Sequence, residues 1–493
     1  MRIDIQKIVY PGRRLGLAEG KVVFTDRGLP GEAVEVEVFK DRKSYVEART
    51  LRVLEPSPSR IEPRCSHFLA CSPYQDMDYG LELEVKRGQV EEIMSRELKR
   101  PFGNLPVTPS PEVWGYRNRI RLKVMREGGA ARFVYNEPGE QASFVTVDRC
   151  HLVPDRVNDI LARTLEMIEG APFSSVTGVE VRTSRSSGES LLVCDLESGA
   201  EAATLADGLA GLKGEFALVG AVASIYDGKK FRDERLFGRD FLEESIRGLT
   251  FRIGARSFFQ TNIGILEKVF DDVVEAVTPQ AQATVADLYS GLGTFGILLA
   301  KKAREVFGVE EAGENIPFLK KNLALNRVGN FAVCEGTTEE WLPEVLERTP
   351  GVVILDPPRK GVDPRIVRGL VDDPVPLLLY MSCNPATLAR DLKGLGEAYS
   401  IAGLSVYDFF PHTPHIETLA VLIRGHNTNF PINPSLRIPR HSRSSISLRE
   451  SGHAENCTRR NPGLSSSFDP EGESAPPGLL LRRRQGLLPH PAQ

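Results

Sequence analysis

The most constraining feature of the sequence is a buried strand that runs directly into a glycine-rich loop and then a helix. Thr284–Tyr289 is an apolar run that predicts a strand, and Ile297–Lys302 predicts a helix. The intervening loop fits the spacing G-x-G-x-x-G through Gly291, Gly293 and Gly296. Glycines at these positions let the backbone approach a ligand closely. The pattern therefore predicts an open α/β sheet that binds a nucleotide-like cofactor.

Two acidic residues follow two further predicted strands. Glu310 follows the strand Glu305–Val309, and a carboxylate there suits a ribose hydroxyl, which nicotinamide dinucleotides and S-adenosylmethionine both carry. Asp356 follows the strand Gly351–Leu355 and is held by the two prolines after it. Methyltransferases commonly place an acid-Pro-Pro turn at this strand, whereas dehydrogenases have no need for one. The turn therefore favours S-adenosylmethionine.

A cysteine and a glutamate stand at two further strand ends. Cys383 follows the apolar run Pro376–Met381, and an Asn-Pro pair leads into a predicted helix, Thr387–Leu395. A thiol at the carboxyl end of a strand can act as a nucleophile, and a small buried hydrophobe is the alternative. Glu417 precedes the final predicted strand, Thr418–Ile423. Its carboxylate is either a proton acceptor or part of a solvated strand entrance.

Together these motifs resemble the RNA 5-methyluridine methyltransferases, which act on uracil in ribosomal and transfer RNA. The order is glycine loop, Asp356-Pro-Pro-Arg-Lys-Gly, Ser-Cys383-Asn-Pro and His-Ile-Glu417, and the resemblance covers residues 1 to about 425. It implies that Cys383 is the nucleophile and Glu417 the general base. It also implies S-adenosylmethionine as cofactor, with contacts at Gln260, Tyr289, Gly291, Gly293, Glu310 and Asp356.

The chemistry of such a reaction explains these residue types. Carbon 5 of uracil is too weak a nucleophile to attack a sulfonium methyl group directly. A thiolate that adds to carbon 6 makes the ring an enolate, and a base must later remove the proton from carbon 5. Because both carbons lie inside a base stack, we expect the uridine to be single-stranded or flipped out.

The front of the chain carries features of an RNA enzyme. Residues 1–57 alternate short apolar and polar runs between glycine turns, which predicts a small OB-like β-barrel similar to the TRAM domain of several RNA-modifying enzymes. The segment Trp114–Val124 alternates strictly and predicts a strand. One face of that strand would carry four unopposed cations: Arg117, Arg119, Arg121 and Lys123. Such a face favours an RNA phosphate track over a merely solvated surface.

Three cysteines suggest a metal site. Cys65, Cys71 and Cys150 stand at positions that ligate a four-iron four-sulfur (4Fe-4S) cluster in many members of the family that the chain resembles. Such a cluster takes four thiolates, but Tyr74 occupies the third cysteine position. The sequence therefore names three candidate ligands and leaves open whether a cluster is bound.

The predicted fold class is α/β, with a barrel in front. We expect a TRAM-like barrel over 1–57, a cysteine segment and central α/β domain for RNA over 58–250, and a Rossmann-like S-adenosylmethionine-dependent methyltransferase domain over 251–425. The helix Leu81–Leu98 is assigned to the central domain. Residues 426–493 are rich in Ser, Pro, Gly and Arg, which predicts a disordered tail.

Composition limits location and partners. The net charge of −4 argues neither for nor against RNA, because local basic faces do the binding. Seven scattered cysteines indicate a reducing compartment, and no apolar run has membrane-spanning length. We expect a cytoplasmic monomer that binds RNA and no membrane. The barrel resembles the ribosomal-RNA branch more closely, so 23S rRNA is the favoured substrate and tRNA the alternative.

Two other functions remain open at this level. An RNA 5-methylcytosine methyltransferase also uses a Ser-Cys nucleophile, but it usually carries a second cysteine in the turn that here reads Asp356-Pro-Pro-Arg359. A nicotinamide-dependent oxidoreductase would use the glycine loop. That reading leaves Cys383, Glu417 and the basic front end without a role.

Overall fold

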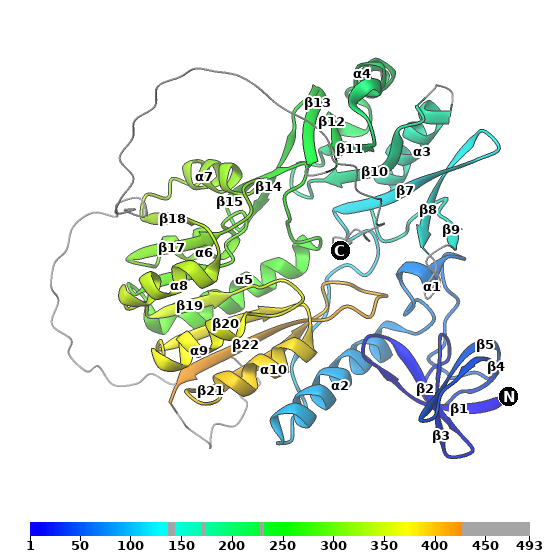
Figure 1. Cartoon of the computed structure of the whole chain (residues 1–493), viewed down its shortest axis with the longest axis horizontal. Coiled ribbons are helices and arrows are strands. Elements are labelled where there is room, and N and C mark those ends of the chain that lie inside the picture. The colour runs from blue at the N-terminus through cyan, green and yellow to red at the C-terminus, as the bar shows by residue number, and fades with distance from the viewer. Residues whose placement is uncertain (137–142, 170–172, 227, 229–230, 426–493) are drawn as a thin grey trace, which may run out of the picture. The chain divides into compact units, whose positions relative to one another are not determined.

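The computed structural model describes residues 1–136, 143–169, 173–226, 228 and 231–425, and the predicted tail over 426–493 lies outside them. Three sheets and a short hairpin organise this part of the chain (Figure 1). No helix among the described residues is long and apolar enough to cross a membrane.

The amino-terminal sheet closes into a barrel of five strands in the order β1-β2-β3-β5-β4. Inward-facing aliphatic side chains alternate with exposed residues along each strand, as a small barrel requires. The strands are β1 (Arg2–Val9), β2 (Arg13–Ala18), β3 (Lys21–Thr25), β4 (Ala33–Asp41) and β5 (Tyr45–Glu55). The predicted barrel is confirmed.

The central sheet has seven strands in the order β13-β12-β11-β10-β7-β8-β9, covered by the amphipathic helices α3 (Asp155–Glu169) and α4 (Ala202–Leu209). A hairpin of β14 (Phe241–Ile246) and β15 (Leu249–Gly254) follows it. The seven strands are β7 (Arg119–Glu127), β8 (Ala130–Asn136), β9 (Phe144–Thr146), β10 (Val176–Thr183), β11 (Ser190–Leu196), β12 (Leu218–Tyr226) and β13 (Phe231–Gly238).

The third sheet has eight strands in the order β18-β17-β16-β19-β20-β22-β21-β6. From β18 to β20 every pairing is parallel, and β22 runs antiparallel to both neighbours. Its strands are β18 (Phe331–Glu335), β17 (Glu305–Glu310), β16 (Thr284–Leu288), β19 (Val352–Leu355), β20 (Leu377–Ser382), β22 (Glu417–Arg424), β21 (Tyr399–Tyr407) and β6 (Val107–Thr108). The predicted Rossmann-like class is confirmed.

Helices cover both faces of this sheet, which explains why its central strands are apolar throughout. Along β19, Val353 and Leu355 pack into one core, and Val352 and Ile354 into the other. The first core takes side chains from α2 (Tyr79–Leu98), α8 (Thr338–Glu347), α9 (Pro364–Asp372) and α10 (Pro385–Leu395). The second takes them from α5 (Ile263–Val277), α6 (Thr294–Ala300) and α7 (Ile316–Leu325).

The packing differs from the predicted domain boundaries in the segment between the barrel and the central sheet. The helix predicted over Leu81–Leu98 exists as α2, but Val90, Ile93 and Met94 pack into the core of the eight-stranded sheet. The short strand β6 also pairs with β21 of that sheet. The assignment of α2 to the central domain is therefore wrong, because its apolar side chains pack into the core of the eight-stranded sheet and not into that of the central sheet.

Candidate active site

Strand order brings the predicted site residues to one edge of the eight-stranded sheet. Glu310 ends β17, Tyr289 follows β16, Asp356 follows β19 and Cys383 follows β20. These four strands are adjacent and parallel, so their carboxyl ends lie side by side. Glu417 opens β22, which runs antiparallel to β20 and therefore begins at the same edge.

The register of β20 and β22 sets Cys383 across from Glu417. Ser382 pairs with Thr418 as the last residue pair, and the Thr418 hydroxyl donates to the Ser382 carbonyl over 3.1 Å. Cys383 is the residue that follows Ser382 at the end of β20, and Glu417 is the residue before Thr418 at the start of β22. Burial, and then the Glu417 charge, raise the pKa of Cys383 to about 12. Burial, and then the Asp356 charge, raise the pKa of Glu417 well above its usual range.

Arg359 is the cation of this centre, and the sequence analysis did not single it out. Its charge lowers the pKa values of both Cys383 and Glu417, against the effect of burial. Its guanidinium Nη2 lies 3.3 Å from His415 Nδ1, and its carbonyl accepts a hydrogen bond from Asn384 Nδ2 at 3.1 Å. The sequence could have indicated Arg359, because this residue directly follows the two prolines of the Asp356-Pro-Pro turn.

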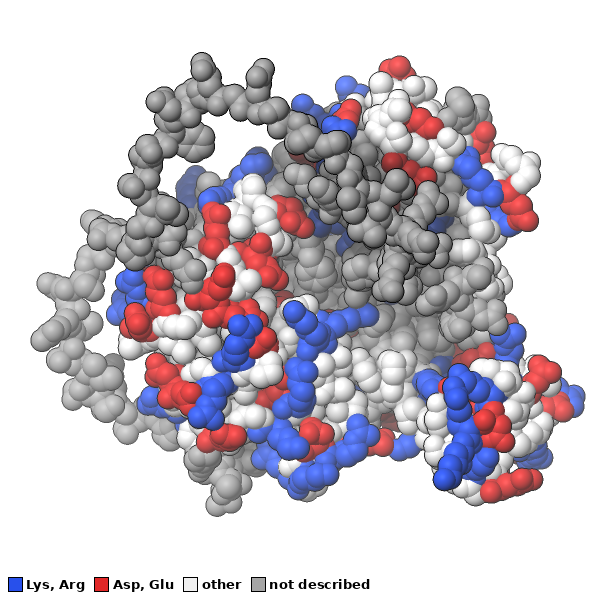
Figure 2. Space-filling model, in the orientation of Figure 1, with Lys and Arg blue, Asp and Glu red and all other residues white. Residues whose placement is uncertain are grey.

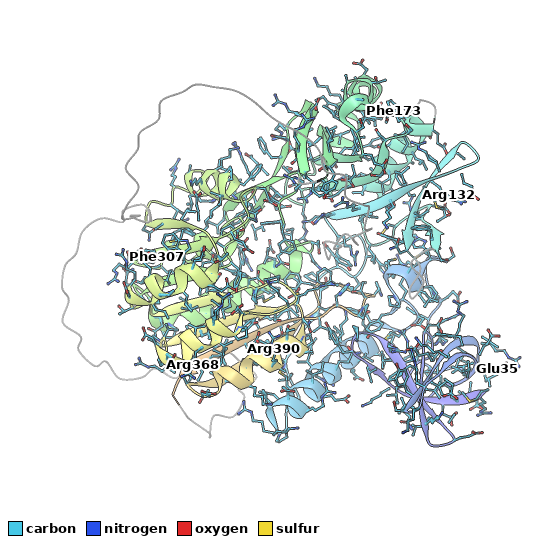
Figure 3. The ribbon with its side chains drawn as sticks, viewed as in Figure 1. Glu35, Arg132, Phe173, Phe307, Arg368 and Arg390 are labelled. Carbon is cyan, nitrogen blue, oxygen red and sulfur yellow. The ribbon has the colours of Figure 1, made fainter. Side chains whose placement is uncertain are left out.

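The turn that carries Asp356 and Arg359 is fixed from α10. Arg390 on α10, labelled in Figure 3, donates to the Lys360 carbonyl at 3.0 Å. The helix begins after Cys383 because Asn384 caps it, accepting from the Ala386 amide at 3.1 Å, and Pro385 occupies its first turn. One helix start therefore holds the thiol and the arginine turn together.

The glycine loop is folded around Glu310. Gly291 and Gly293 adopt positive φ angles of 56° and 85°, which a side chain would strain. The Gly291 amide donates to Glu310 Oε2 at 2.7 Å, and the Ala312 amide donates to Oε1 at 2.8 Å. At Gly296 a Cβ atom would lie 2.4 Å from the Phe331 ring. The third glycine thus serves close packing, and the first two shape the loop.

The chemistry of this edge fits a cationic, ribose-bearing cofactor. Burial raises the pKa values of Asp356 and Asp287 to about 7 each. Burial likewise raises the pKa of Tyr289 to about 12. Gln260 is buried in the segment between β15 and α5, and its main-chain carbonyl accepts from Asn118 Nδ2 at 3.0 Å. S-adenosylmethionine carries a sulfonium, an ammonium and a ribose, which match acidic groups beside a glycine loop.

The three candidate cluster ligands do not fit a four-iron cluster. Gln75 Nε2 donates to Cys65 Sγ at 3.2 Å and to Ser72 Oγ at 2.6 Å, and Ser72 Oγ lies 3.2 Å from Cys71 Sγ. Tyr74, at the missing ligand position, is fully buried, and its hydroxyl accepts from Gln89 Nε2. Among the described residues, no three His, Cys, Asp or Glu side chains are placed to hold a metal ion. Cys150 is buried in the core of the central sheet, and after burial its thiol contributes to the raised pKa values of Cys65 and Cys71, so the three thiols lie near one another although the fourth position carries no thiol.

The sequence predicted four unopposed cations on one face of the strand Trp114–Val124, and this prediction is wrong for Arg117, Arg119 and Arg121. Arg119 binds Glu180 through two hydrogen bonds of 2.8 Å, and Arg121 pairs with Asp195 at 2.8 Å. These partners come from β10, which pairs with β7, and from β11, the next strand beyond it, so the sequence of β7 alone could not reveal them. Arg117 precedes β7 and is buried. Lys123 has a neutral partner, Asn136 Oδ1, at 3.0 Å.

Comparisons with known proteins agree with this geometry. A family model described as tRNA (Uracil-5-)-methyltransferase matches residues 78–425, and a TRAM domain model matches residues 1–51. An "Uncharacterized RNA methyltransferase" from Caldanaerobacter subterraneus is 32% identical over 85% of this chain and 98% of its own. Another, from Clostridium tetani, is 30% identical over 86% of this chain and 97% of its own.

A solved structure shares the fold. The Pyrococcus abyssi tRNA (uracil-54, C5)-methyltransferase, in complex with S-adenosyl-L-homocysteine, aligns with a TM-score of 0.69 at 27% identity, covering 86% of this chain and 100% of that one. The family match sets aside the nicotinamide-dependent alternative. The chain is an RNA methyltransferase with an S-adenosylmethionine-dependent fold and an amino-terminal TRAM domain, and it belongs to the RNA uracil-5-methyltransferase family.

Proposed function

We propose that this enzyme methylates carbon 5 of a uridine in structured RNA, with 23S rRNA as the favoured substrate, through a covalent adduct between Cys383 and the uracil. The observation that carries the proposal is the pairing of β20 with β22, which sets a thiol and a carboxylate across from each other at the cofactor edge of the sheet.

The cofactor site would be formed by the glycine loop and the acidic strand ends. Glu310 would accept from the ribose hydroxyls, and Asp356 would lie beside the cationic end. Gln260 and Tyr289 would border the bound molecule. When bound, S-adenosylmethionine supplies the methyl group to be transferred.

Each protein group then has one task. The Cys383 thiolate forms a bond to carbon 6, so the electron pair of the 5,6 double bond becomes available at carbon 5. After carbon 5 has been methylated, Glu417 takes the proton from that carbon. The double bond reforms and the sulfur–carbon bond breaks, which returns Cys383 as a thiolate. Arg359 lowers the pKa values of both groups and so favours their reactive forms.

RNA contacts would be spread over the barrel, Lys123 and the basic side chains near the active edge. On the face seen in Figure 2, Lys and Arg gather on the barrel and over α2 and α10. Because Arg119 and Arg121 are neutralised by their partners, the phosphate contacts expected from them are assigned instead to cations without a buried counter-charge.

The substrate is tested with transcripts. Unmodified 23S rRNA and tRNA transcripts are incubated with the enzyme and S-adenosylmethionine, and 5-methyluridine is mapped by mass spectrometry. We expect methylation at one uridine of 23S rRNA. Methylation of tRNA alone would overturn the choice of substrate, and no 5-methyluridine in either RNA would overturn the proposed reaction.

The mechanism is tested with two variants that fail differently. Glu417→Gln should still add to the ring and accept the methyl group, but it cannot remove the proton from carbon 5. It should accumulate an RNA adduct that survives denaturing electrophoresis. Cys383→Ala in the same background should abolish that adduct, whereas the control Cys65→Ala should keep it. Normal turnover by Glu417→Gln, or an adduct in the double variant, contradicts these roles.

A further inference from the structure

The turn between the first two strands of the barrel reaches the catalytic edge. This turn is Tyr10-Pro11-Gly12, and Tyr10 packs against the core of the eight-stranded sheet. Burial, and then the Cys383 and Glu417 charges, raise the pKa of Tyr10 to about 12, and the Arg359 charge lowers it. A barrel residue therefore lies within electrostatic range of all three groups of the proposed reaction centre.

The turn is held in place by contacts from three segments. A Cβ atom at Gly12 would lie 2.9 Å from the Pro414 ring, in the loop that leads to Glu417, so the turn packs closely against that loop. Arg14 Nη1 donates to the Gly12 carbonyl at 2.7 Å, and Arg14 Nη2 donates to the Pro73 carbonyl at 2.6 Å. Such a clamped turn can hold an aromatic ring in one position.

Packing against the core does not explain why a tyrosine stands at position 10. The side chain is only half-buried, and no residue of the described part of the chain forms a hydrogen bond with its hydroxyl. Tyr74, whose ring would lie 3.5 Å from a Cβ atom at Gly12, contrasts with it because that tyrosine is fully buried with a bonded hydroxyl. A half-buried ring of this kind can contact a ligand that binds at the edge of the sheet.

We propose that Tyr10 is a substrate-positioning residue whose ring stacks on the target uracil and holds it between Cys383 and Glu417. The inference rests on the proposed function, because it requires a flipped uridine at this edge. A base that leaves its helix loses its stacking partners, and aromatic side chains commonly replace them. The TRAM domain would then bind RNA and also complete the active site.

The test measures coupling between the Tyr10 ring and the target base. The probe is the transcript fragment that the wild-type enzyme methylates, prepared with its target uridine intact or abasic. Affinities are measured for the wild type and for Tyr10→Ala, Tyr10→Phe and Tyr10→Leu. Phe39→Ala is the matched control, since Phe39 is an aromatic residue of the same barrel that is 67% exposed. S-adenosylhomocysteine binding checks that each variant is folded.

We expect the wild type to prefer intact over abasic RNA by about tenfold or more, the range that base–aromatic stacking supplies. Tyr10→Ala should lose that preference, and Tyr10→Leu should lose most of it although it keeps apolar bulk against the core. Tyr10→Phe and Phe39→Ala should retain the preference. In single turnovers at saturating RNA, Tyr10→Ala should also form the adduct more slowly.

Two results would overturn the inference. One is a preference that survives in both Tyr10→Ala and Tyr10→Leu, which would make the ring irrelevant to the base. The other is a loss in Tyr10→Phe as large as in Tyr10→Ala, which would assign the role to the hydroxyl. Failure of the proposed function is separate from both, because it would appear as a wild type that neither methylates the fragment nor forms an adduct.

Discussion

At the scale of single residues, burial and neighbouring charged groups set the protonation of Cys383 in the proposed reactive centre. The Glu417 carboxylate raises the pKa of Cys383, and Arg359 lowers it. A thiol whose pKa is about 12 is almost entirely protonated at neutral pH, whereas the proposed attack on carbon 6 requires the thiolate. If the proposed mechanism holds, the electrostatics of the free protein limit the rate at which the adduct forms.

This balance predicts the pH dependence of adduct formation. Below the pKa of Cys383 the thiolate fraction rises about tenfold per pH unit, so the single-turnover rate should rise between pH 6 and 9. Glu417→Gln removes a charge that raises this pKa, which shifts the profile to lower pH. Arg359→Gln removes a charge that lowers it, and should slow the reaction about tenfold at pH 7.

The measurement is the rate of covalent adduct formation by quenched flow followed by denaturing electrophoresis. Arg368→Gln is the matched control, because Arg368 is exposed on α9 and pairs only with Asp372 there. Profiles that move the same way in the Glu417 and Arg359 variants would contradict the assigned signs.

At the scale of elements, the loop from β21 to Glu417 depends on one helix. Lys86 of α2 is fully buried, and its Nζ donates to Asp408 Oδ1 at 2.6 Å and to the Phe410 carbonyl at 3.0 Å. Glu82, one turn earlier, accepts from the His412 amide at 2.7 Å. Burial lowers the pKa of Lys86, but the two carboxylates raise it by more, so the ammonium stays charged. The loop is held by a charge network inside the core.

Lys86→Met should therefore destabilise the protein by about 3–5 kcal/mol, because it leaves two buried carboxylates without their cation. Adding Asp408→Asn should recover part of that loss. Lys393→Met, which removes the exposed pair between α10 and Glu97 of α2, should cost less than about 1 kcal/mol. Denaturant unfolding gives the three values, and equal losses for Lys86 and Lys393 would show that the network is not coupled to stability.

At the scale of the whole molecule, buried ion pairs join the barrel to the chain that follows it. Asp76 is fully buried and lies 3.3 Å from Arg14 Nη2 in the barrel and 3.5 Å from Arg60 Nη1. Arg60 also binds Glu32 of the barrel through hydrogen bonds of 2.6 and 2.7 Å. These contacts hold the turn that carries Tyr10.

Asp76→Asn keeps the shape of the side chain but removes the charge that Arg14 and Arg60 share. We expect a loss of roughly 3 kcal/mol in barrel stability, read by hydrogen exchange over β1 and β2. RNA methylation should fall while S-adenosylhomocysteine affinity stays unchanged. Asp41→Asn, which removes only an exposed pair with Lys21, is the control. Unaltered exchange over β1 and β2 would exclude Asp76 as a tether.

The sequence by itself determined the elements and most of the chemistry. Three apolar runs, each followed by a loop with Gly291, Asp356 or Cys383, predicted parallel strands. A strand that is buried on both faces is apolar along its length, so its polar residues lie beyond its carboxyl end. Local spacing likewise predicted the barrel. These are properties of contiguous residues, which a sequence displays directly.

Only the tertiary structure decided which residues meet. Arg119 and Arg121 looked unopposed until neighbouring strands supplied Glu180 and Asp195. Helix α2 was predicted correctly, but its core was not, because buried Glu82 and Lys86 hide its inner face from any hydrophobic pattern. The place of Tyr10 beside Cys383 had no local signal at all. Ion pairs and packing contacts join segments that are far apart in the chain. The spacing of residues within one segment therefore does not reveal them.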